Sequence, residues 1–347
     1  MLDSIEYPSH AYAMYSLMLL MIIYTQNQWA RYILNYLYAV PYDDGESDAS
    51  LISLTYSCDL TATEYGLLTG YGFSATFVIT GLFMGRAADM YNRKNIVTIG
   101  CYIWNIALTG MGMSNDFTQL LAFRLLLGFG QAFSNPASYS MIADLFPAEK
   151  RATGNGIFAS GVYIGGGLAS VSESIAESIG WRETMYLCAI IGAGVATILF
   201  VTVGEPARQK TVSKEVKKTD EPSISTMESM KLIFGSPKVC VLLAAASVRY
   251  MGGYAISGYL PDMYDYVFTS YTTQYSYINA YVVAFGGFVS SNAGGRITQM
   301  WVESGETRAN YYVPMIGCLL GCPFMVICCL SSNFYVSLCV GLFGEYL

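Results

Sequence analysis

Residues 85–94 read GRAADMYNRK and connect two long apolar stretches. Gly85 would let two helices approach closely, and the acidic and basic residues that follow would form a charge cluster at a membrane edge. A simple stop-transfer flank needs only positive charge, so an acid within the basic run favours a latch that holds one face closed in one state and releases it in another. The predicted gating residues are Gly85, Arg86, Asp89, Arg93, Lys94 and, in a later loop, Arg151.

The composition places this stretch in a membrane protein. Of 347 residues, 54% are hydrophobic and 12% are charged, and the mean hydropathy is +0.40. A soluble domain carries about 25% charged residues, so a chain with half that share needs a lipid-facing surface. The net charge of −7, without a basic stripe, excludes nucleic acid as a partner. The single histidine and the 9 cysteines, mostly within apolar runs, form no metal-site or disulfide pattern.

Ten mostly apolar stretches run along the chain, and a helix that spans a bilayer needs about 20 such residues. We therefore predict an all-α integral membrane protein. The stretches are residues 11–38, 63–88, 94–113, 118–143, 153–175, 183–203, 239–268, 273–298, 310–331 and 334–347. The last one is too short to span, so we expect the C-terminal helix bundle to be incomplete.

A lysine-rich hydrophilic segment divides the stretches into two groups. We predict an N-terminal six-helix bundle at residues 1–203, a linker at residues 204–238 and a C-terminal bundle at residues 239–347. Basic residues flank the loops on the linker side, whereas the opposite loops are acidic or neutral apart from Arg182. Since Lys and Arg collect on the cytoplasmic side, the N-terminus and the linker are expected there.

The spacing G-x-x-x-D-x-x-x-R-K in residues 85–94 resembles the signature loop of the major facilitator superfamily. Residues 124–132, RLLLGFGQA, look like the family's R-x-x-x-G-x-G-x-A segment, and residues 144–154 look like the loop that follows it. The resemblance implies two six-helix halves, with about nine or ten of the twelve transmembrane helices in this chain. It also implies alternating access, in which the halves rock around a central site.

Within that superfamily the chain looks most like the spinster-type lipid transporters, with two departures. Their helix-1 pattern N-x-x-D-R is present as NQWAR at residues 27–31, so Ala30 replaces the acid. Their pattern G-x-G-E-A has Gln131 at the position of the acid. Those acids are the obvious proton carriers of the family, so the sequence favours facilitated transport over coupling to protons.

Polar side chains recur on one face of three predicted helices, at residues 11–38, 118–143 and 239–268. Residues three or four apart share a helix face, so these stripes would line a central cavity. Alternatively, such side chains bond helix to helix, and for single asparagines this reading is favoured. The predicted substrate-binding residues are Asn27, Arg31, Arg124, Gln131, Asn135, Arg249, Tyr250 and Tyr254.

Three arginines lie within apolar stretches: Arg31, Arg124 and Arg249. A charge at the bilayer centre costs at least about 2.5–3.5 kcal/mol, so each arginine should face the bundle interior and have a partner. The acids near membrane depth that could serve are Glu173 and either Asp262 or Asp265. This excess of buried cations predicts an anionic substrate or lipid headgroup.

Glycines recur in the fifth stretch. Gly161 and Gly165 have the small-xxx-small spacing that permits close contact between helices. We interpret this run as a packing surface and a hinge.

We predict a secondary transporter that moves a small organic, anionic or lipid-like solute by alternating access. The alternative is a transporter-like structural subunit of a larger membrane complex that does not transport. The sequence has no phosphate loop, no His-Glu-x-x-His pair and no nucleophile elbow, so an enzyme is not expected. No cofactor is predicted. The expected partners are bilayer lipids, the solute and, in the alternative, other subunits.

Overall fold

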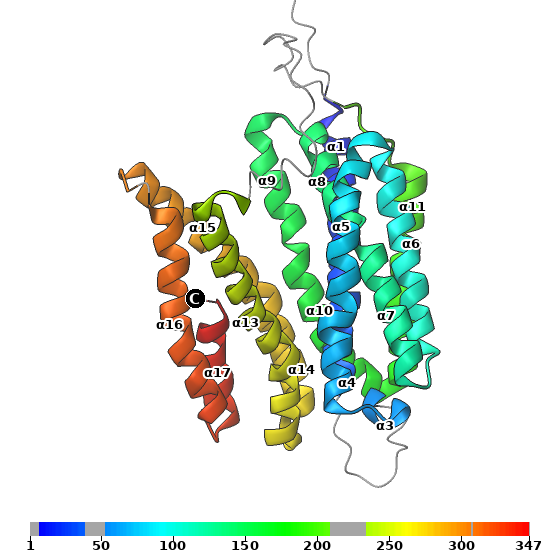
Figure 1. Ribbon diagram of the computed structural model, residues 1–347, viewed down its shortest axis with the longest axis vertical. Coiled ribbons are helices and arrows are strands. Elements are labelled where there is room, and N and C mark those ends of the chain that lie inside the picture. The colour runs from blue at the N-terminus through cyan, green and yellow to red at the C-terminus, as the bar shows by residue number, and fades with distance from the viewer. Residues whose placement is uncertain (1–6, 39–52, 209–233, 307, 347) are drawn as a thin grey trace, which may run out of the picture.

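The computed structural model describes residues 7–38, 53–208, 234–306 and 308–346. Within them every regular element is helical, which confirms the predicted all-α class (Figure 1). The first group of helices is α1 His10–Leu37, α3 Leu54–Cys58, α4 Ala62–Gly66, the π-helix η1 Leu67–Tyr71, α5 Gly72–Met90, α6 Arg93–Gly112, α7 Phe117–Gln131, α8 Ser134–Leu145, α9 Ala148–Ala159, α10 Gly161–Ile179 and α11 Trp181–Thr202. The second group is α13 Pro237–Val267, the short η3 Thr269–Tyr271, α14 Thr272–Tyr281, the π-helix η4 Val282–Gly286, α15 Gly287–Glu303, α16 Ala309–Leu330 and α17 Phe334–Tyr346.

Side-chain caps fix where several helices begin. α1 starts after Ser9, whose hydroxyl accepts a hydrogen bond from a backbone N–H of the first turn. α4 starts with a capping box, in which Thr61 and Glu64 each accept from the other's backbone N–H. The Asn92 and Asp116 side chains cap α6 and α7, each by accepting a hydrogen bond from a backbone N–H of the first turn. These caps satisfy N–H groups that a helix start leaves without partners, so the short turns between long helices are set locally.

Two stretches predicted as single helices are each divided between two separate α-helices, and two others, residues 63–88 and 273–298, contain the π-helices η1 and η4. Residues 118–143 fall in α7 and α8, and residues 153–175 fall in α9 and α10. Pro136 explains the first break, because it has no N–H and its ring opposes the carbonyl four residues earlier. At the second break the Ser160 hydroxyl donates to the Ile157 carbonyl at 2.6 Å and competes with the helical backbone bonds.

α1 packs closely on α10 in the first group. A Cβ added at Gly165 would collide with the Thr25 carbonyl oxygen and would lie 2.7 Å from the Gln28 Cβ. A Cβ at Gly161 would lie 3.1 Å from the Met21 carbonyl oxygen. The predicted close contact at these glycines is therefore confirmed, and its partner is α1.

A buried hydrogen-bonded network joins α1, α6 and α11. The Gln26 amide Nε2 donates to Asn105 Oδ1 at 2.8 Å and to the Cys188 carbonyl at 3.2 Å. Trp104 Nε1 donates to Gln26 Oε1 at 2.7 Å. The network gives hydrogen-bond partners to these buried amide and indole groups, so it holds α1, α6 and α11 in register.

Among the described residues, 4 helices are long and apolar enough by length and composition to cross a membrane: Ala62–Met90, Trp181–Thr202, Pro237–Val267 and Tyr311–Leu330. Other long helices are divided or carry buried polar residues, as α1 does at Gln26, Asn27 and Arg31. Such residues are tolerated where other helices, rather than lipid, surround them.

Two sides of the molecule can be distinguished. α11 ends and α13 begins on one side, which we call the linker side, and the opposite side is the distal side (Figure 1). The predicted boundaries at residues 204–238 and the cytoplasmic orientation stay predictions. Several lysines and acids on which these two predictions depend lie outside the described residues. They are Lys210, Lys214, Lys217, Lys218, Lys231, Asp43, Asp44, Glu46 and Asp48.

The two groups of helices bond to each other toward the distal side. The Ser170 hydroxyl donates to the Ser276 carbonyl at 2.9 Å, and the Ser276 hydroxyl donates back to the Ser170 carbonyl at 2.6 Å. The Asn279 amide donates to the Tyr36 hydroxyl at 3.0 Å. We call these contacts, together with the bond from the Tyr65 hydroxyl to the Gly258 carbonyl at 2.8 Å, the distal closure.

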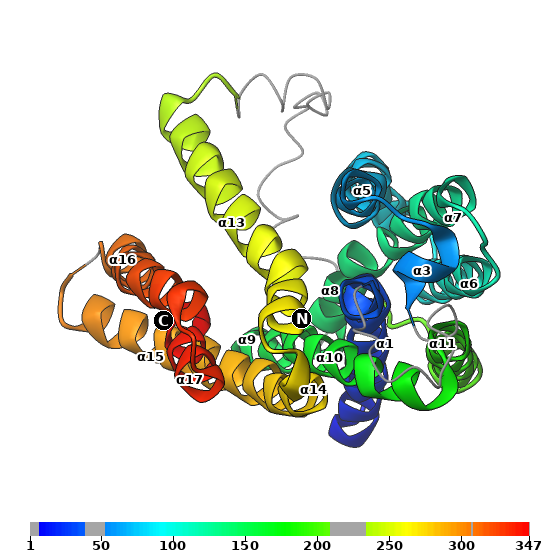
Figure 2. The ribbon, with the colours of Figure 1, turned by 90° about the horizontal axis from the view of Figure 1, so that it is seen from below.

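Toward the linker side, α13 diverges from the first group. Residues 241–255 of α13 are exposed throughout, although the same helix is buried in part near its distal end. Figure 2 shows the start of α13 far from α1, and its other end near α1 and α10. The two groups are therefore joined on the distal side and separate toward the linker side.

Candidate functional site

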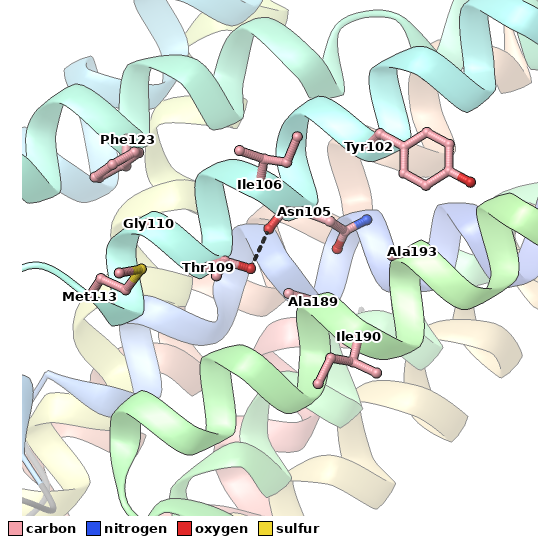
Figure 3. Close-up of a pocket in the computed structure, with 10 residues that line it drawn as sticks. All are labelled: Tyr102, Asn105, Ile106, Thr109, Gly110, Met113, Phe123, Ala189, Ile190 and Ala193. Carbon is pink, nitrogen blue, oxygen red and sulfur yellow. Dashed lines mark hydrogen bonds between the residues drawn. The ribbon is translucent and has the colours of Figure 1, made fainter.

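One cavity lies on the outer face of the first group and has a volume of about 420 Å³. Figure 3 shows the apolar side chains of Ile106, Phe123 and Ile190 around it. Its polar groups are already engaged, because the Thr109 hydroxyl donates to the Asn105 carbonyl at 2.9 Å and the Asn105 amide donates to a carbonyl of its own helix. This cavity offers an apolar surface and is a poor candidate for a solute site.

A second cavity, of about 770 Å³, lies where α1, α13, α16 and α17 meet. Its volume falls within the range of small-molecule sites, about 300–1,000 Å³. The predicted residues Arg249, Tyr250 and Tyr254 line it, together with Tyr32 of α1. Its remaining wall consists of apolar residues and glycines, such as Val326 of α16. The cavity thus combines an apolar lining with a few polar groups.

Arg31 and Arg124 are buried next to each other, and neither has an acidic partner among the described residues. Arg31 Nε donates to Gln131 Oε1 at 3.1 Å, and Arg124 Nη2 donates to the Arg31 carbonyl at 2.8 Å. Both guanidinium groups lie near the Phe73 ring, 4.6 and 5.4 Å from its centroid. Arg31 Nη2 and Arg124 Nη1 have no hydrogen-bond partner in the segments that the structure describes. The pair therefore keeps unused donors.

Phenol groups from both helix groups gather beside Arg31. Tyr24 and Tyr32 of α1 lie within electrostatic reach of Arg31, and Tyr250 and Tyr254 of α13 lie within reach of Tyr32. Tyr32 is off the predicted polar stripe of its helix, and only the position of α13 brings it to the cavity wall. The cavity wall thus contains the predicted residues of α13, whereas its α1 residue is Tyr32 rather than the predicted Asn27 or Arg31.

Asn27, Gln131 and Asn135 lie behind this wall. Gln131 Nε2 donates to the Asn27 carbonyl at 2.8 Å, while its oxygen accepts from Arg31. Asn27 and Gln131 are each 1% exposed, so neither lines the cavity in this conformation. Asn27 Nδ2 and Asn135 Oδ1 have no partner in the described part of the chain. Gln131 orients Arg31, and the asparagines keep spare hydrogen-bonding capacity.

The acids expected to neutralise these arginines lie elsewhere, so that prediction is wrong for Arg31 and Arg124. Trp29 Nε1 donates to the Ser172 hydroxyl at 2.7 Å, so Ser172 faces α1. Glu173, the next residue, is turned about 100° around the helix axis and points to another neighbour. That neighbour is Asp265 of α13, with which it interacts electrostatically.

Arg93 of the predicted gating cluster is 1% exposed and has two acidic partners. Its Nη1 donates to Asp144 Oδ2 at 2.5 Å, and its Nε donates to Glu205 Oε1 at 2.7 Å. The backbone N–H of Lys94 donates to the other Glu205 oxygen at 3.0 Å. These bonds tie the start of α6 to the end of α8 and to the residues after α11, all within the first group.

The other predicted gating residues form fewer ion pairs and hydrogen bonds than Arg93. Asp89 and Arg86 are exposed, and Asp89 forms no ion pair with Arg93, whose acids come from Asp144 and Glu205 instead. A Cβ at Gly85 would meet nothing within 4 Å, so no described helix approaches there. Arg151 Nε donates to the Phe146 carbonyl at 3.1 Å and closes the turn between α8 and α9.

Several curated transporters are similar to parts of the chain. The cis,cis-muconate transport protein of Acinetobacter baylyi is 25% identical over 283 residues, which are 77% of this chain and 66% of that protein. The sphingosine-1-phosphate transporter of Danio rerio is 28% identical over 140 residues, 39% of this chain and 28% of that protein. The multidrug transporter protein MdtP of Bacillus subtilis is 31% identical over 150 residues, 42% of this chain and 26% of that protein. These matches span less than two thirds of each relative.

The fold is shared with a solved structure, that of a bacterial homologue of the human lysosomal transporter Spinster in an inward-facing, unoccupied conformation. The alignment has a TM-score of 0.75 at 24% identity and covers 98% of this chain and 73% of that one. This likeness confirms the predicted fold. The predicted resemblance to the spinster type is confirmed together with the curated relatives, among them protein spinster homolog 1 of Mus musculus, which is 28% identical over 140 residues, 39% of this chain and 26% of that protein.

The model of one protein family matches nearly the whole sequence. It is the model of the Major Facilitator Superfamily, and it matches residues 11–346. The match agrees with the signature loop at residues 85–94 and with the helical architecture, and it confirms a transporter family rather than an enzyme family. The chain belongs to the Major Facilitator Superfamily.

Proposed function

We propose that the chain is part of a secondary transporter that moves a small organic anion or an anionic, lipid-like solute by alternating access. The observation that carries this proposal is the pair of buried guanidinium groups of Arg31 and Arg124. Within the described part of the chain neither group has an acidic partner, and each has an unused donor nitrogen.

An anionic solute would supply the missing counter-charge. A buried cation without a counter-ion is costly, and a carboxylate or phosphate offers both charge and hydrogen-bond acceptors. Arg31 is 8% exposed and Arg124 is 1% exposed, so Arg31 would meet the solute while Arg124 positions it through the Arg31 carbonyl. Arg249 on the cavity wall adds a further cation, and the tyrosines add neutral donors.

The relatives give partial support for this charge preference. By their names, three of them carry cis,cis-muconate, sphingosine-1-phosphate and hexuronate, which are a dicarboxylate, a phosphorylated lipid and a sugar acid. Other relatives are multidrug transporters, whose names specify no charge. Acidic groups are thus frequent among the named solutes.

The conformation supports alternating access. The halves bond at the distal closure and separate toward the linker side, and the basic loops suggest that the linker side is cytoplasmic. In this state the solute would enter or leave on the linker side. Rocking of the halves would break the distal closure and bring α13 toward the first group on the other side.

A ligand screen tests the proposal. Purified full-length chain is heated in the presence of anionic metabolites, lysolipids and their uncharged analogues, and a ligand raises the unfolding temperature according to its affinity. We expect anionic compounds, and not their uncharged analogues, to raise the unfolding temperature of the chain. Arg249→Gln should weaken that ligand's affinity by about 10- to 100-fold, because a hydrogen bond to a charged group contributes about 1.5–3 kcal/mol.

Arg296→Gln is the matched control, since Arg296 is an exposed cation of the second group that does not line the cavity. It should leave the affinity unchanged. Equal stabilisation by charged and uncharged compounds would contradict the anion preference. A chain that no compound stabilises would favour the non-transporting subunit instead.

A further inference from the structure

Glu173 and Asp265 form a buried pair of carboxyl groups between the two halves. Glu173 lies on α10 and is 1% exposed, and Asp265 lies on α13 and is 5% exposed. Neither carboxyl oxygen of Glu173 has a hydrogen-bond donor among the described residues, and the same holds for Asp265 Oδ1. The two carboxyl groups lie within hydrogen-bonding reach of each other. Each is thus the main polar neighbour of the other.

The charges around this pair are all acidic. Glu177 on α10 and Asp262 on α13 are the further groups whose charges act on it. From α14, the Thr273 hydroxyl donates to Glu177 at 3.3 Å. Within the described residues neither acid of the pair forms an ion pair with a cation, and no cluster of three or more metal-ligating side chains is present. A metal ion or a basic side chain therefore does not neutralise the pair.

Two ionised carboxylates cannot share a buried, cation-free position, because burial and mutual repulsion both disfavour the second charge. One proton between them turns the repulsion into a hydrogen bond from a carboxylic acid to a carboxylate. Bonds of this charge-assisted type are short and strong. Two aspartates that share one proton in aspartic proteases follow the same rule.

We infer that Glu173 and Asp265 form a proton-binding site that holds the two halves together on the distal side. In the closed arrangement the pair is one carboxylic acid and one carboxylate. When the halves separate there, water reaches both groups, both become carboxylates, and one proton passes to the distal solution. The inference rests on the proposed function only in assuming that the halves rock.

This site would restore proton coupling at a new position. The acids that the spinster pattern would place at positions 30 and 131 are Ala30 and Gln131 here, so the first group has lost both. The pair instead spans both halves, beside the distal closure. A proton bound there acts on the contact that must break during transport, so its binding is linked directly to the conformational change.

The sign of the pH effect follows from this linkage. The closed arrangement binds one proton more than the open one, so acidic conditions favour closure on the distal side and alkaline conditions favour opening. For one proton the ratio of open to closed molecules changes by at most about tenfold per pH unit.

Distance measurements on the full chain without any solute test the site. Spin labels are introduced as unnatural amino acids at Ser178 and Ser270, exposed positions at the distal ends of the two halves, so that the native cysteines stay unlabelled. In the wild-type chain the long-distance population should rise with pH. The ratio of long-distance to short-distance molecules should increase by up to about tenfold per pH unit, the slope for one proton. Glu173→Gln should remove the slope and keep the short distance, because the glutamine amide donates to Asp265 as the shared proton does.

Glu177→Gln is the control, because Glu177 is an exposed acid on the same helix. It should keep the pH response, with at most a displaced midpoint. Asp265→Asn provides a second test should Glu173→Gln fail to fold, and it should also abolish the slope. A folded wild-type chain with a pH-independent distance would overturn the inference, and so would a Glu173→Gln variant with the wild-type slope. Since no solute is used, failure of the ligand screen and failure of this titration are separate results.

Discussion

Arg93 and the two internal arginines, Arg31 and Arg124, differ in what neutralises them. Arg93 lies between two carboxylates, whereas the described partners of Arg31 and Arg124 are an amide, main-chain carbonyls and aromatic rings. A fully paired cation is suited to holding elements together. A cation without an acid is suited to receiving one from a ligand. The same residue type is therefore suited to a structural role at Arg93 and, in the function we propose, to a binding role at Arg31 and Arg124.

Arg93→Gln should destabilise the first group. Its removal leaves the carboxylates of Asp144 and Glu205 close together without a cation, which we expect to cost about 2–4 kcal/mol. Thermal or denaturant unfolding of the purified chain measures this loss. Asp89→Asn is the control, and because Asp89 is exposed and unpaired it should change stability by no more than about 0.5 kcal/mol. If Asp89→Asn lowered the free energy of unfolding more than Arg93→Gln did, the result would support the latch predicted from the sequence.

For single residues, the sequence predicted which arginines are buried better than it predicted the residues that bond to them. Arg31, Arg124 and Arg93 stood out because charge is rare in this chain. Their neighbours could not be read in the same way, because Asp144 and Glu205 lie 51 and 112 residues from Arg93. Glu173 and Asp265 were noticed as acids near helix ends, but nothing in their local sequence shows that they face each other.

Among the elements, α10 depends most on small residues. Gly161 and Gly165 face α1, and Gly167 faces the Ala280 carbonyl of α14. Glycine at these positions removes the Cβ that would otherwise keep the helix axes apart. α10 therefore packs closely on the first group with one face and on the second group with another.

Gly165→Ala should destabilise the chain by about 1–3 kcal/mol, because the new methyl group must displace α1 at Thr25 and Gln28. Gly156→Ala in α9 is the matched control, since a Cβ there meets nothing within 4 Å. It should stabilise the chain by about 0.4–1 kcal/mol, because it restricts the unfolded state. Unfolding curves of both variants in one detergent give the comparison, and equal effects would show that the α1–α10 contact is looser than described.

Helix positions were predictable to within a few residues where one apolar run makes one helix. The expected stretch 94–113 is α6, Arg93–Gly112, and the stretch 310–331 is α16, Ala309–Leu330. The prediction failed where hydropathy continues through a local break, as at Pro136 or at the π-helix η4. Hydropathy reports what surrounds a segment, and only backbone chemistry reports where its hydrogen-bond ladder stops.

For the whole molecule, the balance between open and closed distal sides rests on few polar contacts. Asn279→Ala removes the bonds from this amide to the Tyr36 hydroxyl and to Ser170 Oγ at 3.1 Å. Each such bond contributes about 0.5–1.5 kcal/mol net, so the open population should rise roughly tenfold. The Ser178–Ser270 spin-label distance reports this population. Gln274→Ala, on the same helix but bonded within its own half to Tyr335, should leave it unchanged.

The stretch of α10 from Tyr163 to Glu177 touches the second half along its length, at Gly287, Val283, Ala280, Ser276 and Thr273. The ends of this stretch are fourteen residues apart, a rise of roughly 21 Å along the helix, so this is a line of contact rather than a point. Much of the line is built from glycine, alanine and serine, which have no long side chains to interlock. Such a surface behaves as a bearing: apart from Tyr163 at one end, which packs against Gly287, one half can roll along α10 without displacing a large side chain.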